Sequence, residues 1–353
     1  MPLRRVQVTD FRCLHSASLD LDPKFTLVSG PNASGKTSLL ESLYVLGRGR
    51  SFRTRRLEHL IRRGAERFIV FGEVDGVAGR VPLGVEGSAS GVRARIAGTT
   101  PPTLAELALR LPVQIIDPEV HRLIEEGPSR RRRYLDWGVF HVEQAFVGSW
   151  QRYQQALKQR NAALKSGEVG VVAAWDADLV RYGEVISDAR RRYVEALAGP
   201  AAEIGRDLLG MELGLSYRPG WPKEQPFGAS LKDSLAHDRE MGSTQVGPHR
   251  AELSIRLDGV SVKDRISRGQ QKLLAATLLM AQIKLFPADA AVQPTLLLDD
   301  PAAELDDERL ARLILQVSGQ SLQLVITTLH GDFTAFGSPG RRYSVAEGVV
   351  TPT

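Results

Sequence analysis

The stretch "SGPNASGKTSLL", residues 29–40, decides how this chain is interpreted. It matches the phosphate-loop pattern G-x-x-x-x-G-K-[ST]. Glycines allow backbone N–H groups to approach phosphates, and the N-terminus of the helix behind them adds about half a positive charge. Lys36 is expected to reach the β- and γ-phosphates of a nucleotide, and Thr37 to offer its hydroxyl to Mg²⁺. The residues predicted to bind ATP are Gly30, Pro31, Asn32, Ala33, Ser34, Gly35, Lys36 and Thr37.

The flanking sequence supplies the structural context that this loop needs. "KFTLVSG" is an apolar run that ends in the loop, and "TSLLESLYVL" follows with leucines on one helical face. We therefore predict a strand, then the loop, then a helix.

Composition points to a soluble protein of the reducing cytoplasm. The 353 residues are 42% hydrophobic and 25% charged, as in ordinary globular proteins. A single cysteine, Cys13, excludes an internal disulfide and a thiolate metal cluster. The N-terminus lacks the apolar core of a signal peptide. The longest apolar run, Leu273–Ile283, is far shorter than the roughly 20 residues that span a bilayer.

Positive charge is concentrated in the first part of the chain. The net charge is +5 overall, whereas residues 1–103 carry 16 Lys/Arg against 9 Asp/Glu. A concentrated basic stretch suits a polyanion, and a solvated loop or contacts between subunits are the alternatives. The candidate DNA-binding residues lie in "GRGRSFRTRR" and are Arg48, Arg50, Arg53, Arg55 and Arg56.

The order of patterns predicts an α/β protein with an inserted helical lobe. Residues 1–103 contain the phosphate loop and short alternating strands separated by Gly-rich turns, typical of an antiparallel sheet. Residues 104–240 are dominated by helical patterns that end near Pro200, without a sustained heptad repeat. Residues 241–353 return to strands, including two apolar runs suited to buried parallel strands. The two outer segments are therefore expected to form one nucleotide-binding lobe.

"TLLLDDPAAELD", residues 295–306, is predicted to supply the metal-binding strand. Asp299 would lie at the carboxyl edge beside the phosphate loop, where it can hold Mg²⁺. Asp300 comes next and is the candidate to orient or deprotonate an attacking water. Gln114, in "LPVQIIDPE", is the candidate to link the metal to the helical lobe, with a plain surface glutamine as the alternative.

"ISRGQQKLLAATLLMAQIKLF", residues 266–286, predicts a capped apolar helix with a second anion site at its start. A purely structural cap at Ser267 is the alternative. Together with the two preceding motifs, the segment resembles the signature helix of ABC-type ATPases, whose common pattern is L-S-G-G-Q. This chain has Ile266, Ser267, Arg268, Gly269 and Gln270 at those positions, so arginine replaces the first glycine.

The resemblance to ABC-type ATPases implies a dimer. In that family the signature helix of one subunit contacts the γ-phosphate held by the phosphate loop of the other. One loop and one signature per chain then imply two chains around a two-fold axis with two ATP molecules between them. The resemblance implies an acid that crosses between the sites at Asp306. It also leaves two candidates for a phosphate sensor, Thr328 and His330, and places the shorter Asp300 where many members carry a glutamate.

A wider set of segments resembles the RecF family of bacterial recombinational-repair ATPases. The segments are "MPLRRVQVTDFRCL", "GPNASGKT", "GRGRSFRT", "LDWGVFHVE", "LKQRNAAL", "TQVGPHRAEL", "ISRGQQK" and "LLLDDPAAELD". The resemblance implies ATP-dependent dimerisation on DNA, whether gapped, single-stranded or duplex, without strong sequence preference. It further implies slow Mg²⁺-dependent, DNA-stimulated ATP hydrolysis, cooperation with RecR and RecO in loading the recombinase at gaps, and a part in SOS induction. The head resembles those of SMC ATPases without their coils.

Two other functions are compatible with the phosphate loop. The ATPase subunit of a membrane transporter would share the loop, the signature and dimerisation, but it would leave the arginine-rich segment unexplained. A monomeric kinase or GTPase is the second alternative, and the chain lacks the N-K-x-D motif that reads guanine. His249, in "STQVGPHRAEL", has no second metal ligand at useful spacing, so a structural or interface role is expected.

Overall fold

The computed structural model describes residues 2–76, 79–143, 145–167, 169–262, 266–287, 292–304, 307–331 and 335–353. The chain divides into two compact units, which we call the nucleotide unit (1–120 and 287–353) and the helical unit (121–286). These boundaries differ from the expected ones at 103 and 240. Strand pairing explains the difference, because β7 (Val113–Ile116) pairs with a strand of the nucleotide unit and β9 (Glu252–Leu257) pairs with one of the helical unit.

The nucleotide unit contains a six-stranded sheet in the order β14-β13-β3-β12-β11-β7. All neighbouring pairs are parallel except β13 with β14. Its remaining strands are β3 (Phe25–Ser29), β11 (Thr295–Asp299), β12 (Gln323–Thr328), β13 (Arg341–Ala346) and β14 (Val349–Pro352). The two apolar runs predicted as buried parallel strands are β11 and β12, and every residue in both is buried. Parallel strands place their carboxyl ends at one edge, where the phosphate loop follows β3.

A second sheet of the same unit is antiparallel, in the order β2-β1-β4-β5-β6. Its strands are β1 (Leu3–Phe11), β2 (Leu14–Asp20), β4 (Arg67–Val74), β5 (Val81–Ser88) and β6 (Gly91–Ile96). Buried residues alternate with half-buried ones along β4 after the exposed Arg67, and buried Val6 and Val8 alternate with exposed neighbours along β1, which confirms the predicted sheet with one wet face. The helix after the phosphate loop, α1 (Lys36–Arg48), contacts strands of both sheets, so its leucines join a single hydrophobic core.

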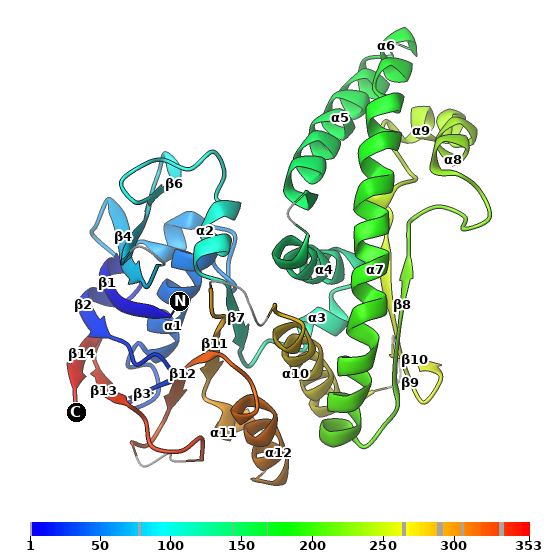
Figure 1. Ribbon diagram of the computed structural model, residues 1–353. Coiled ribbons are helices and arrows are strands. Elements are labelled where there is room, and N and C mark those ends of the chain that lie inside the picture. Colours follow the sequence, from blue (N-terminus) through cyan, green and yellow to red (C-terminus); the bar gives the residue numbers. More distant parts are fainter. Residues whose placement is uncertain are drawn as a thin grey trace. The chain divides into compact units, whose positions relative to one another are not determined.

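Short helices complete the nucleotide unit. They are η1 (Leu57–Leu60), α2 (Ala105–Arg110), α11 (Pro301–Glu304) and α12 (Asp307–Ser318). In Figure 1 the early strands and α1 are blue, while β11 to β14 run from brown to red, so residues from both ends of the sequence share this unit.

The helical unit is built around α7 (Asp176–Leu209), a 34-residue helix of roughly 50 Å that contacts α5, α10, α4 and β8. The sequence predicted a helix ending at Pro200, but α7 continues through that proline. Proline removes one backbone donor, and the buried side chains of Ala201, Ile204 and Leu208 continue the apolar face beyond it. Burial of that face therefore outweighs the local cost. The other helices are α3 (Arg122–Glu125), α4 (Pro128–Val142), α5 (Phe146–Ser166), α6 (Val169–Ala174), α8 (Phe227–Asp233), α9 (Leu235–Met241), η2 (Pro248–Arg250) and α10 (Arg268–Lys284).

A three-stranded antiparallel sheet, β10-β9-β8, completes this unit with β8 (Leu213–Arg218) and β10 (Val260–Ser261). The turn between β9 and β10 is the predicted Asp-Gly hairpin. Asp258 and Gly259 both have positive φ, 47° and 76°, as a type I′ turn requires.

In the described segments, no helix combines the length and the apolar character needed to cross a membrane.

Candidate nucleotide-binding site

The phosphate loop is held by backbone contacts from strands distant in sequence. The N–H of Gly30 donates to the carbonyl of Thr328 at 3.2 Å, and the N–H of Gly348 donates to the carbonyl of Ser34 at 2.8 Å. A Cβ on Gly30 would lie 2.2 Å from the Val345 carbonyl oxygen, so the close packing of loop and β13 requires glycine there. Ala33 and Gly35 have φ of 61° and 116°. Such alternation turns successive N–H groups inward and creates an anion-binding concavity.

The ammonium group of Lys36 is buried inside this loop. Its Nζ donates to the Gly30 carbonyl at 2.6 Å and to the Pro31 carbonyl at 2.9 Å. The side chain thus lies over the concavity formed by the loop backbone, at the first position of α1. A cation and the positive end of a helix therefore converge on the same point.

Thr37 and Asp299 meet at the carboxyl edge of the parallel sheet. The Thr37 hydroxyl donates to Asp299 Oδ2 at 2.8 Å, and the same carboxylate accepts from the Thr327 hydroxyl, through Oδ1, at 2.7 Å. Asp299 is 5% exposed at the end of β11. A hydroxyl and a carboxylate are hard oxygen donors, the ligand type that Mg²⁺ prefers. The residues present therefore fit a magnesium ion bound together with a nucleotide.

Asp300 follows Asp299 in a constrained backbone conformation. Its φ of 47° lies in the left-handed region, which aspartate tolerates better than most residues. Its N–H donates to Thr327, both to the carbonyl and to the hydroxyl, at 3.1 Å each. Thr327 therefore fixes both consecutive aspartates, a role for which the sequence motif gave no signal.

The other predicted members of the site are placed differently. Gln114 is aligned with Leu296, three residues before Asp299 on β11. Three residues of strand correspond to roughly 10 Å, and alternation puts Gln114 on the opposite face of the sheet from Asp299. The structure therefore does not bring Gln114 to the Thr37–Asp299 pair, although its side chain is buried.

Of the two candidate phosphate sensors, Thr328 is buried at the end of β12 and its carbonyl supports the phosphate loop. His330 lies beyond the strand and is exposed. Asp306 lies outside the described residues.

The predicted signature segment begins α10 in the helical unit. Ser267 caps the helix, because its side chain accepts from the Gln270 N–H at 3.3 Å while the Gln270 side chain accepts from the Ser267 N–H at 3.0 Å. Ser267, Arg268 and Gly269 are exposed. The reciprocal cap explains the structural part of the motif, and it leaves the N-terminus of a long apolar helix open to solvent.

The arginine-rich segment is anchored to α1 by a buried carboxylate. Glu41 is fully buried and accepts from Arg12 at 2.9 and 2.8 Å and from the Ser51 hydroxyl. It also forms an ion pair with Arg53 at 3.5 Å. Arg53 is therefore partly neutralised.

Four of the five candidate arginines, Arg50, Arg53, Arg55 and Arg56, are exposed. Arg48 is half-buried with its guanidinium 5.5 Å from the centre of the Tyr44 ring. Burial lowers the pKa of Arg48.

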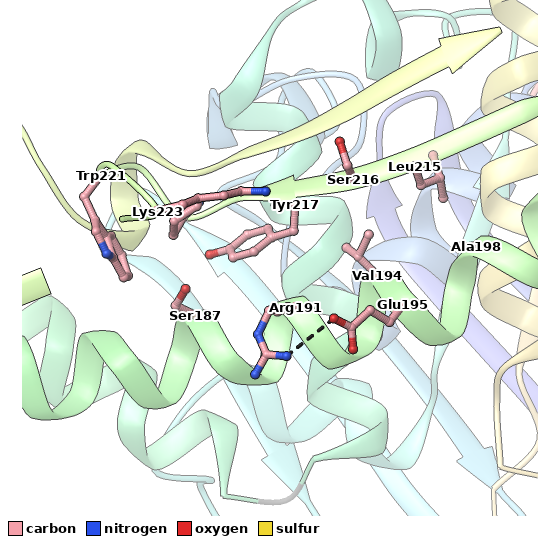
Figure 2. Close-up of a pocket in the computed structure, with 11 residues that line it drawn as sticks. Ser187, Arg191, Val194, Glu195, Ala198, Leu215, Ser216, Tyr217, Trp221 and Lys223 are labelled. Carbon is pink, nitrogen blue, oxygen red and sulfur yellow. Dashed lines mark hydrogen bonds and ion pairs between the residues drawn. The ribbon is translucent and has the colours of Figure 1, made fainter. Parts of the chain in front are cut away.

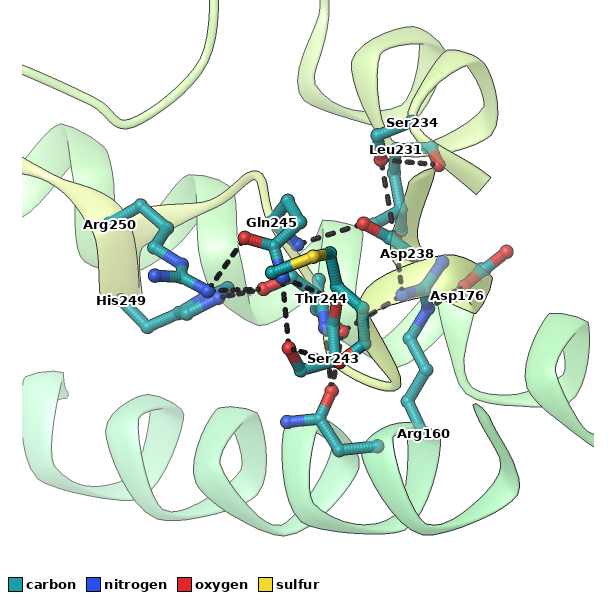
Figure 3. A network of polar contacts seen from close by, with 12 residues as sticks. Arg160, Asp176, Leu231, Ser234, Asp238, Ser243, Thr244, Gln245, His249 and Arg250 are labelled. Atoms are coloured by element: carbon teal, nitrogen blue, oxygen red, sulfur yellow. Dashed lines mark hydrogen bonds and ion pairs between the residues drawn. The ribbon is translucent and has the colours of Figure 1, made fainter. Parts of the chain in front are cut away.

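A polar network in the helical unit explains His249 (Figure 3). His249 Nε2 lies 2.9 Å from the Thr244 carbonyl, which can only accept, so this nitrogen carries the proton. Nδ1 then accepts from the Tyr153 hydroxyl at 2.6 Å. Burial lowers the pKa of His249 to about 4. The histidine is thus a neutral structural link.

Arg160 lies in the same network. It is fully buried and donates to Asp238 at 2.7 Å, to Thr244 at 2.8 Å and to Asp176 at 2.8 Å.

Comparisons with known proteins agree with this geometry. The family described as "RecF/RecN/SMC N terminal domain" matches residues 2–344. The chain is 40% identical over 362 residues to the DNA replication and repair protein RecF of Pseudomonas syringae pv. syringae, covering 100% of this chain and 99% of the relative. It is 36% identical over 356 residues to RecF of Pectobacterium atrosepticum, covering 99% of each.

Solved structures give the same result. A structure described as the recombination mediator protein RecF-ATP in the RecFOR pathway matches with a TM-score of 0.89 and 27% identity, covering 100% of this chain and 97% of the other. An SMC head domain from Pyrococcus furiosus matches with a TM-score of 0.60 and 19% identity, which shows a shared fold.

The fold and the site define an ATPase head of the SMC-like ABC class, with a mainly helical second unit inserted between the two halves of the nucleotide-binding unit. Within this class, the chain belongs to the RecF family of DNA replication and repair proteins.

Proposed function

We propose that this protein is an ATP-controlled DNA-binding ATPase of recombinational repair and replication restart, which closes as a homodimer around two ATP molecules. The observation that carries the proposal is the 2.8 Å contact between Thr37 and Asp299. It joins the phosphate loop to the end of β11 and puts two oxygen donors where a magnesium nucleotide needs them.

In the proposed cycle, the loop backbone and Lys36 hold the phosphates, while Thr37 and Asp299 hold Mg²⁺. The bound ion supplies charge neutralisation at the β- and γ-phosphates. Asp300 orients the attacking water. Its side chain is one methylene shorter than glutamate, so we expect slow hydrolysis; each tenfold loss of rate corresponds to about 1.4 kcal/mol.

The second chain supplies the opposite wall of each site. The start of α10, with the exposed Ser267, Arg268 and Gly269 and the half-buried Gln270, is the surface that contacts the γ-phosphate held by the partner. We assign the segment around Asp306 to the crossing between the two sites. Dimerisation is thereby coupled to the presence of ATP.

DNA binding is assigned first to the exposed arginines of residues 50–56. Contacts would be mainly to phosphates of gapped, single-stranded or duplex DNA, and therefore tolerant of sequence. Similarity to a mediator of the RecFOR pathway supports RecR and RecO as partners in loading the recombinase at gaps, together with a contribution to SOS induction. We place this activity in the cytoplasm. A transporter ATPase subunit is not favoured, because the relatives that match over the full length are RecF proteins.

The test is sedimentation of Asp300→Asn with and without ATP·Mg²⁺, then with a gapped DNA at two salt concentrations. We expect a monomer that becomes a dimer only with ATP and carries DNA less well at high salt. Lys36→Met is the matched control, which should remain monomeric. A monomer under every condition would contradict the two-chain site.

A further inference from the structure

Strand β8 forms an open edge of the small sheet in the helical unit. Its only partner among the described strands is β9. The N–H of Asp258 donates to the Glu212 carbonyl at 2.9 Å, so Glu212 and Asp258 form a hydrogen-bonded pair of the ladder. The next pair, Leu213 with Leu257, is therefore a pair without hydrogen bonds between its two residues. Alternation in an antiparallel ladder then directs the N–H and C=O of Leu213, Leu215 and Tyr217 away from β9. No described strand pairs with that side.

Helix α7 provides a floor beside this edge (Figure 2). Ser187, Arg191, Val194, Glu195 and Ala198 follow one another at helical spacing and line a hollow of about 700 Å³. Its other wall includes Leu215 and Tyr217, two of the residues whose backbone groups point outward. A volume of this size is typical of a site that binds a compact organic ligand or a short peptide.

The side chains that line the hollow are partly apolar and partly charged. Val194 and Leu215 offer apolar surface, and Trp221 is stacked on Phe227 with ring centroids 4.5 Å apart. Arg191 is paired with Asp188 at 3.1 Å and with Glu195 at 3.4 Å.

Lys223 also lines the hollow. It is exposed and forms no ion pair with any residue that the structure describes. Within the described residues, Lys223 is therefore a positive charge at the rim of the hollow without an ion-pair partner.

We propose that the open edge of β8 accepts an extended segment of a partner protein as an added strand. Outward backbone groups of Leu215 and Tyr217 would supply the ladder hydrogen bonds, which is the mode called β-augmentation. Alternate apolar residues of the segment would face Val194, and an acidic residue would face Lys223. Single-stranded DNA fits less well, because its backbone has no N–H groups to complete the ladder with β8 and because Arg191 is already paired with Asp188 and Glu195. The proposal is independent of the nucleotide cycle.

The first experiment uses fluorescein-labelled hexapeptides of alternating valine and aspartate, with blocked ends, titrated with the full chain. Fluorescence anisotropy should show saturable binding. Amides of valine and of aspartate point to opposite edges of an extended strand, so methylating one set of amide nitrogens should weaken binding about tenfold and methylating the other set should not. Hydrogen exchange should slow within residues 213–218.

Two variants locate the site. Leu215→Pro removes an outward N–H and leaves the ladder to β9 intact, so it should weaken binding about tenfold with an unchanged melting temperature. Lys223→Glu should lower affinity for the aspartate peptide and raise it for a valine–lysine peptide. Lys232→Glu is the matched control, because Lys232 is exposed and does not line the hollow.

Three results would overturn the proposal. The first is no saturable binding of the aspartate peptide up to about 1 mM. The second is equal weakening by both patterns of amide methylation, since that would show that the backbone edge is not used. The third has two parts: a single-stranded oligonucleotide displaces the peptide from the wild-type chain, and the Leu215→Pro variant does not bind that oligonucleotide. Together they would show that the edge of β8 binds DNA.

Discussion

The hydroxyl of Thr327 hydrogen-bonds the Asp299 carboxylate at 2.7 Å and accepts a bond from the backbone N–H of Asp300 at 3.1 Å. One side chain on β12 therefore sets the positions of both acidic residues that follow β11. The proposed metal ligand and the proposed water-orienting residue cannot move independently of the neighbouring strand.

Thr327→Val tests this coupling. Valine keeps the shape of threonine but removes the hydroxyl that donates to the buried Asp299 carboxylate, at about 1–3 kcal/mol. It also removes one of the two acceptors of the Asp300 N–H, whose bond to the Thr327 carbonyl remains. We expect weaker Mg²⁺-dependent ATP binding, slower hydrolysis and a lower melting temperature. Thr277→Val is the control, because that buried hydroxyl bonds the Leu273 carbonyl in the helical unit. It should change stability without changing the Mg²⁺ dependence. Equal nucleotide affinity in Thr327→Val and the wild type would contradict the coupling.

Ser267→Arg separates nucleotide binding from dimerisation. The substitution places a bulky cation at the exposed start of α10, so each monomer should bind ATP normally while the ATP-dependent dimer is lost. Sedimentation and nucleotide binding on the same sample check this. Ser267→Ala measures the cost of the helix cap alone, about 1 kcal/mol. An ATP-dependent dimer of normal affinity in Ser267→Arg would show that this surface is not in the interface.

The arginine segment predicts a specific salt dependence of DNA binding. Each phosphate contact contributes about 0.9 to the slope of log K against log salt for duplex DNA. Arg55→Ala and Arg56→Ala should each reduce that slope, whereas Arg53→Ala should reduce it less because Glu41 already neutralises Arg53. Arg239→Ala, exposed on α9, serves as the control. Unchanged slopes in both Arg55→Ala and Arg56→Ala would remove these residues from the DNA surface.

His249 predicts loss of stability in mild acid. Burial lowers its pKa in the folded protein to about 4, below the ordinary value of 6.5. The unfolded chain therefore binds the proton more tightly, so the contribution is present above pH 6.5 and is lost as pH falls through 4. The loss is at most about 3 kcal/mol.

The measurement is the free energy of unfolding between pH 7 and 4. His249→Gln should flatten that dependence, whereas His237→Gln, at an exposed position, should leave it unchanged. If His249→Gln kept the pH dependence of the wild-type free energy of unfolding, other titrating groups would be responsible for it.

Sequence patterns predicted the elements of the site whose position follows from strand order. A phosphate loop after one apolar strand and an acid after another must meet at the carboxyl edge of a parallel sheet. The same reasoning could not predict the roles of Thr327 and Glu41 or the contact of Gly348 with the phosphate loop. Each of these depends on which distant strand or loop packs beside the site in the folded chain. Gln114 shows the limit of the same reasoning, since strand register put it on the other face.

The division into units shows a second limit. Composition changes near residues 103 and 240, but strand pairing assigns β7 to the nucleotide unit and β9 to the helical unit. Likewise, Pro200 is a local helix-breaking signal that the buried face of α7 overrides. Local signals therefore failed where long-range packing supplied the larger energy.

The bond between Gly348 and Ser34 has a consequence for synthesis on the ribosome. The phosphate loop is translated well before the segments that support it, because β12, β13 and Gly348 are made more than 280 residues later. In a nascent chain that lacks β12 and β13, strand β3 has neither of the two strands that flank it in the sheet. The ability to bind nucleotide should therefore appear abruptly, when residues 323–348 leave the exit tunnel, and an arrested chain ending before residue 323 should not retain ATP.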